Sequence, residues 1–167
     1  MGLMSFFARL AQILKSNLNE LISRSEDPEK MLEQVIRDMS EQLTEATKQV
    51  AVAIADEKRL EKAYNNEATV AADWEKKAML AVKAGKDELA KEALARKKEH
   101  DGLAAAYHEQ WQKQAAAVKQ LKMALKALNQ KIEEAKRKKN VLIARKRRAE
   151  AMKSIQETMS GLTTSSH

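Results

Sequence analysis

Two sets of residues in this sequence have the types and spacing to bind another surface. The first is an apolar face within residues 1–24. At 100° per residue, the large apolar side chains of this segment lie on one half of a helix and most polar ones on the other. Such a face either packs on the rest of the chain or lies in the interface of a bilayer, where flanking cations meet lipid phosphates. The residues assigned to membrane binding are Leu3, Met4, Phe6, Phe7, Arg9, Leu10, Ile13, Leu14, Lys15, Leu18, Leu21 and Ile22.

The second set is a basic block over residues 136–148, which holds eight cations and no acid. A block of this kind either binds the phosphates of nucleic acid or pairs with carboxylates. No aromatic residue is interleaved with it and no DNA-reading motif surrounds it, which favours pairing. The expected contacts, within one hairpin or between copies, join Glu26, Asp27, Glu29 and Glu33 to Lys136, Arg137, Lys138, Lys139, Arg145, Lys146, Arg147 and Arg148.

The sequence contains no pattern typical of catalysis. There is no cysteine, and no phosphate-binding loop, metalloprotease helix or nucleophile elbow is recognisable. His100 and His108 lack acidic partners at metal-ligand spacing along the chain. We therefore expect no catalytic residues, no cofactor and no metal site, and a protein that is not an enzyme.

No stretch of the chain approaches the roughly 20 consecutive apolar residues that cross a bilayer. The segment 1–24 also lacks the continuous apolar core of a signal peptide. We therefore expect this segment to remain on the mature protein, as a surface element rather than as a membrane span.

Long helices must position both sets, because alanine, glutamate, lysine, leucine, arginine and glutamine dominate the chain and only four glycines and one proline interrupt it. From Leu32 to Ala81 the apolar residues step by four and three, which is the spacing of a coiled-coil seam. Glu57 and Glu67 break this seam. We expect these two residues to set the register of the coiled coil or to contact a neighbouring copy.

Breaks in this pattern divide the chain into parts. Asp27 and Pro28 suit an N-cap and a first helical position, and Gly85 suits the C-cap of a tight turn. Folding about Gly85 is expected to bring Tyr64 close to Tyr107 across the seam. The predicted fold is all-α, with an N-terminal amphipathic helix followed by a long antiparallel coiled-coil hairpin. The expected parts are the amphipathic helix over 1–24, a linker and cap over 25–28, hairpin helices over 28–84 and 87–160, a tip turn at 85–86 and a polar tail over 161–167.

Four segments of the sequence resemble the phage shock protein A family, which includes the vesicle-inducing protein of plastids. The family is similar in fold to the ESCRT-III membrane-remodelling proteins. The segments are the start Met1-Gly2-Leu3 with its amphipathic helix, the stretch SEDPEKMLEQ over residues 25–34, the tip AGKDELAKEAL over residues 84–94, and residues 134–146. The second segment is the most specific of the four, and together they cover nearly the whole chain.

The resemblance implies a peripheral protein that binds anionic membranes, assembles with itself into rods or rings, and maintains or remodels bilayers under envelope stress. It implies a cytoplasmic location on the inner face of the plasma membrane, or on thylakoid or plastid inner membranes in a photosynthetic source. Family members continue into further helices that pack across neighbouring hairpins, whereas this sequence ends at His167, so we expect weaker polymer assembly.

Two other functions remain open. In the phage shock branch, the resemblance implies a coiled-coil adaptor that inhibits an AAA+ transcriptional activator. A basic nucleic-acid-binding coiled coil is less favoured, because no aromatic residue is interleaved with the basic block and no DNA-reading motif surrounds it. The sequence does not decide between the phage shock branch and the plastid branch.

Overall fold

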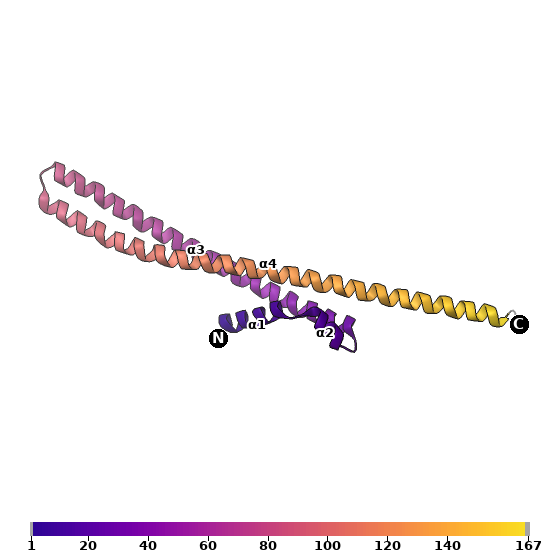
Figure 1. The fold of residues 1–167 in the computed structure, drawn as a ribbon. Coiled ribbons are helices and arrows are strands. Elements are labelled where there is room, and N and C mark those ends of the chain that lie inside the picture. Colours follow the sequence, from indigo (N-terminus) through magenta and orange to yellow (C-terminus); the bar gives the residue numbers. More distant parts are fainter. Residues whose placement is uncertain (1, 166–167) are drawn as a thin grey trace. The chain divides into compact units, whose positions relative to one another are not determined.

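The structure, a computed structural model, describes residues 2–165, and their side chains except those of residues 2–4, 6, 7, 164 and 165. Four α-helices follow one another in this range: α1 (Gly2–Lys15), α2 (Leu18–Arg24), α3 (Pro28–Lys83) and α4 (Asp87–Ser165) (Figure 1). Helices α3 and α4 form an antiparallel hairpin, and no strand is present in residues 2–165. The predicted all-α class is therefore confirmed.

The chain divides into two compact units. Residues 46–123, here called the tip unit, contain the turn of the hairpin and the parts of α3 and α4 next to it. Residues 1–45 and 124–167, here called the base unit, contain α1, α2, the start of α3 and the end of α4. Both sets of candidate residues lie in the base unit.

The tip turn is a Schellman motif at Gly85. This residue has φ +74°, a left-handed conformation that residues with a Cβ atom rarely adopt. Its N–H donates to the carbonyl oxygen of Val82 at 3.0 Å, and the N–H of Lys86 donates to the carbonyl oxygen of Ala81 at 2.8 Å. These two bonds satisfy carbonyl groups in the last turn of α3 and reverse the chain.

The buried seam of the tip unit is rich in alanine, and an aromatic cluster lies along it. The ring centroid of Tyr64 on α3 lies 4.9 Å from that of His108 and 6.0 Å from that of Trp111, both on α4. The predicted contact of Tyr64 with Tyr107 is wrong, because Tyr64 faces these two rings instead. His108 and Trp111 are three residues apart and share one helix face, whereas Tyr107 is rotated from His108 by about 100°.

One of the two seam glutamates pairs within the hairpin. Oε2 of Glu67 lies 2.5 Å from Nδ1 of His100, and both side chains are about one quarter exposed. The pair joins residues 33 positions apart in the chain, so it marks the register of α3 against α4. His100 therefore has an acidic partner that spacing along the chain could not reveal.

Gly102 lies inside α4, where it weakens the helix. An added Cβ atom at this position would meet nothing within 4 Å, and the residue does not have a positive φ. Because alanine in a helix interior is more stable than glycine by about 1 kcal/mol, we expect Gly102→Ala to raise the free energy of unfolding by about that amount. Urea denaturation followed by circular dichroism measures the change. The same substitution at Gly85 should lower stability instead, because its φ is positive.

In the base unit, the amphipathic segment forms two helices rather than the one helix predicted over residues 1–24. The interruption falls at Ser16 and Asn17. Oγ of Ser16 donates to the carbonyl oxygen of Ile13 at 2.6 Å, and Oδ1 of Asn17 accepts from the N–H of Glu20 at 3.2 Å. These local side-chain bonds end α1 and cap α2. The apolar periodicity continues through the break, which explains why the sequence predicted a single helix.

The start of α3 follows the sequence prediction. Oδ1 of Asp27 accepts a hydrogen bond from the N–H of Lys30 at 3.2 Å, and Pro28 is the first residue of the helix. Proline suits this position because its missing N–H would have no partner inside the helix.

The largest fully buried side chains of the base unit come from three helices. Leu18 of α2, Leu32 and Met39 of α3, and Leu128 of α4 are each at most 1% exposed. They are the largest fully buried side chains among the described residues. Helix α2 therefore belongs to the packed core of this unit.

The end of α4 extends further than the sequence predicted. Residues 161–165, expected to be a polar tail, continue the helix to Ser165. Oγ1 of Thr163 donates to the carbonyl oxygen of Met159 at 3.0 Å, and one glycine at Gly161 costs a helix only about 1 kcal/mol. The described side chains of residues 144–163 are all exposed.

Candidate functional site

The apolar face of the amphipathic segment is partly turned toward the hairpin. Leu10 is 3% exposed and Leu18 is 1% exposed. Ile13, Leu14, Leu21 and Ile22 are half-buried, whereas the cationic residues Arg9 and Lys15 are exposed. The predicted residues Leu3, Met4, Phe6 and Phe7 lie outside the described side chains. The face thus has a docked part and a part that the structure does not describe.

Two lysines of α4 hold the segment at its interruption. Nζ of Lys131 donates to the carbonyl oxygen of Ser16 at 2.5 Å. Nζ of Lys138 donates to Oδ1 of Asn19 at 2.6 Å. Lys131 was not among the predicted site residues, because only the packing of α1 and α2 against α4 reveals its role.

The basic block makes few ion pairs in the base unit. Nζ of Lys139 lies 3.3 Å from Oε1 of Glu33, which joins α4 to α3. Lys136 and Lys138 reach glutamates one turn earlier on α4, at 3.6 and 4.0 Å. Among the described residues, no ion pair joins the other predicted acids, Glu26, Asp27 and Glu29, to the block.

The predicted contacts are therefore largely unrealised within one chain. Asp27 caps α3 instead of pairing with α4. The described side chains of Arg137, Arg145, Lys146, Arg147 and Arg148 are exposed and have no carboxylate at ion-pair distance. Contacts between copies stay a prediction for these five cations.

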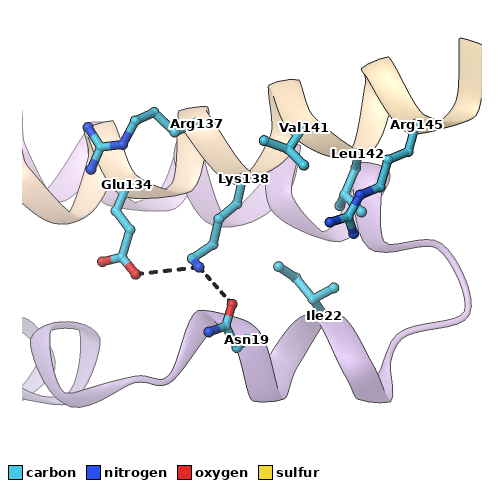
Figure 2. A pocket seen from close by; sticks show the side chains of 8 residues that line it. All are labelled: Asn19, Ile22, Glu134, Arg137, Lys138, Val141, Leu142 and Arg145. Atoms are coloured by element: carbon cyan, nitrogen blue, oxygen red, sulfur yellow. Dashed lines mark hydrogen bonds and ion pairs between the residues drawn. The ribbon is translucent and has the colours of Figure 1, made fainter. Parts of the chain in front are cut away.

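A groove of about 490 Å³ lies between α2 and the basic block (Figure 2). Figure 2 shows Lys138 and Arg145 reaching from α4 toward α2 on either side of Ile22, while the guanidinium of Arg137 points away from α2. The groove combines cations with an apolar floor. Its lining residues are Asn19, Ile22, Glu134, Arg137, Lys138, Val141, Leu142 and Arg145.

The sequence contained part of the signal for this groove. Arg137 and Val141, and likewise Lys138 and Leu142, are four residues apart, so cations and apolar residues alternate along one face of α4. The contribution of Asn19 and Ile22 depends on where α2 packs, and no local pattern predicts that. Chemically, the arrangement suits non-covalent binding of an anion that carries an apolar group.

The fold and this surface define a class of protein, a helical hairpin with an amphipathic N-terminal segment docked beside a basic block. The chain belongs to the PspA/IM30 family, which it matches over residues 5–167. This membership confirms the family resemblance seen in the sequence.

The family includes membrane-associated relatives. The chain is 47% identical over 163 residues to the membrane-associated protein Vipp1 of Synechocystis sp., covering 98% of this chain and 61% of that protein. It is 42% identical over 148 residues to a phage shock protein A homolog of Deinococcus radiodurans, covering 89% and 66%. It is 38% identical over 162 residues to the chloroplastic membrane-associated protein VIPP1 of Arabidopsis thaliana, covering 97% and 49%. The chain therefore spans between half and two thirds of the length of these relatives.

A membrane-spanning helix is not among the elements that the structure describes. Although α3 and α4 have 56 and 79 residues, neither contains a stretch that is long and apolar enough to cross a bilayer.

Proposed function

We propose that this chain is a peripheral membrane protein that binds anionic bilayers and helps to maintain or remodel them. Helix α1 lies in the lipid interface, while the hairpin stays in water. The protein acts on the inner face of the plasma membrane, or on photosynthetic membranes in a photosynthetic source. Two of the relatives are named membrane-associated, which supports this proposal.

The observation that carries the proposal is the presence of the amphipathic segment and the basic block in one compact unit. An amphipathic helix supplies apolar area for the interface, and each nearby cation adds up to about 1 kcal/mol at an anionic surface. The largely unpaired cations of the block are available for this role. Cations that were paired with carboxylates inside the hairpin would not be available to bind lipid.

Vesicle flotation tests the proposal. We expect the chain to float with vesicles that contain phosphatidylglycerol and to remain at the bottom with pure phosphatidylcholine. Added salt should weaken the binding, because it screens exposed charges. If the chain binds neither kind of vesicle but binds an AAA+ activator, the result would support the adaptor function instead.

The docked arrangement competes with insertion, because Leu10 is buried in the base unit and must be released to reach lipid. The bond from Lys131 to the Ser16 carbonyl holds α1 in the docked state. We therefore expect Lys131→Met to bind anionic vesicles about fivefold more tightly than Lys126→Met, since one hydrogen bond contributes about 1 kcal/mol to docking. Both variants lose one positive charge, and Lys126 is exposed.

Vesicle titration of the two lysine variants gives the ratio, and hydrogen exchange of the α1 amides gives the docking equilibrium. Faster exchange in Lys131→Met accompanies tighter binding if docking competes with insertion. Equal affinities together with equal exchange rates would contradict the competition.

We also propose that the hairpin assembles with copies of itself. Four apolar side chains near the end of α4 are between 56 and 61% exposed and follow one another at intervals of three, four and three residues. This is the spacing of a coiled-coil seam, so a second helix can cover it. The residues are Met152, Ile155, Met159 and Leu162. Assembly multiplies the weak membrane affinity of single amphipathic segments.

A further inference from the structure

The groove between α2 and α4 has the composition of a site for an amphiphilic anion. Its charged lining residues are Arg137, Lys138 and Arg145 against the single carboxylate of Glu134. Lys138 is already shared between Asn19 and Glu134, at 2.6 and 4.0 Å. The two arginines have no carboxylate partner among the described residues. An excess of positive charge therefore faces a concave surface, which concentrates anions.

The floor of the groove is apolar. Ile22 of α2 and Leu142 of α4 are half-buried, and Val141 is 48% exposed. Figure 2 shows Ile22 between the amine of Lys138 and the guanidinium of Arg145, which both reach toward α2, with Val141 and Leu142 on α4 above it. A small hydrated anion would leave this apolar surface in contact with water. An anion joined to a hydrocarbon chain would cover it, with its charged group beside Lys138 and Arg145, the two cations that reach toward α2.

We propose that this groove binds the phosphate headgroup of one anionic phospholipid, with the upper part of its acyl region on Ile22, Val141 and Leu142. The proposal rests on the membrane-binding function proposed above and assigns a defined site within it. Arginine suits the role, because its planar fork donates two parallel hydrogen bonds to phosphate oxygens. A phosphate monoester, as in phosphatidate, exposes more oxygens than a diester, so we expect phosphatidate to bind more tightly than phosphatidylglycerol.

The site can persist while the membrane is bound. Leu18 anchors α2 in the core of the base unit, and the interruption at Ser16 and Asn17 separates α2 from α1. Helix α1 can therefore enter the interface while α2 remains against α4 and keeps the groove intact. The groove would then lie close to the lipid surface that α1 occupies.

A pair of double variants tests the site. Arg137→Gln with Arg145→Gln removes two charges from the groove, and Arg147→Gln with Arg148→Gln removes two charges from the same helix outside it. We expect the groove variant to lose about tenfold more affinity for phosphatidate vesicles than the control, and to lose its preference for phosphatidate over phosphatidylglycerol. Arg145→Lys keeps the charge but not the fork, so part of the preference should be lost.

Methyl NMR with a water-soluble short-chain phosphatidate identifies the source of the phosphate. We expect the lipid to shift the methyl signals of Ile22, Val141 and Leu142 and inorganic phosphate to leave them unchanged at the same concentration. If inorganic phosphate or a short oligonucleotide shifts these signals and displaces the lipid, the assignment to a phospholipid is overturned.

The outcomes separate the two proposals. If the wild-type chain binds vesicles and both double variants lose equal affinity, the groove is not a specific site, and the membrane function stands. If the wild-type chain binds no vesicles, the membrane function fails, and the NMR titration still decides whether the groove binds the short-chain lipid.

Discussion

A chain that carries Phe6→Glu together with Phe7→Glu is expected to lose vesicle binding almost completely. Each phenylalanine buried in the interface contributes about 1.5–3 kcal/mol, and each new carboxylate is repelled by an anionic surface at about 1 kcal/mol. Together these terms correspond to a loss of at least about a thousandfold in affinity. Flotation with phosphatidylglycerol vesicles measures the effect.

A matched control separates apolar contact from charge. Ser5→Glu with Gln12→Glu introduces the same two charges on the polar face of α1, where both residues are exposed. This control should bind more weakly than wild type but still float at low salt. If the Phe6 and Phe7 double variant floats as well as this control, insertion of the apolar face is not the basis of binding and the proposed function fails.

The second large effect is expected at Leu128, which is 0% exposed in the core of the base unit. Leu128→Ala removes buried contacts and leaves a cavity, so we expect the free energy of unfolding to fall by about 2–5 kcal/mol. Met152→Ala in the same unit should cost much less, because Met152 is 56% exposed. Urea denaturation of the two variants gives the comparison.

Hydrogen exchange locates the effect of Leu128→Ala within the chain. Amides in the base unit should lose protection, whereas those near Gly85 in the tip unit should keep it, because the chain packs as two compact units. Equal loss in both units would mean that the hairpin unfolds as one cooperative body. Equal stability of the Leu128 and Met152 variants would contradict the packing described for the core.

Much of the hairpin could be predicted from the sequence because its signals are local. The four-and-three spacing of apolar residues identifies both the helices and the seam. Asp27 with Pro28 and Gly85 mark the helix ends through capping geometry, which depends on single residues. These features need no knowledge of distant contacts.

The register and the break in the amphipathic segment were harder to predict. Counting residues outward from Gly85 placed Tyr64 opposite residue 106 and therefore close to Tyr107. Neighbouring residues of α4 point about 100° apart, and Tyr64 contacts His108 instead. The break at Asn17 depends on the competition of short polar side chains with the helix backbone, and the apolar pattern does not report it.

The sequence located the charged residues of the site, but it did not predict which of them form ion pairs. The sequence placed the basic block opposite the acidic residues near Pro28, and Lys139 with Glu33 is such a pair. Long cationic side chains lose conformational entropy when they are held in one geometry, and exposed pairs contribute little, so proximity alone does not create a bridge. Glutamates on the same helix also compete, as at Glu133 and Glu134.

The cap at Asn17 bears on the angle between α1 and α2. Because α1 and α2 begin and end independently, the angle between them is set at the two-residue connection. A helix of 14 residues, about 21 Å long, can then change its tilt without unwinding the seven-residue helix that follows. For the membrane function proposed above, one hairpin would then suit flat and strongly bent bilayers, with the difference in angle taken up near Asn17.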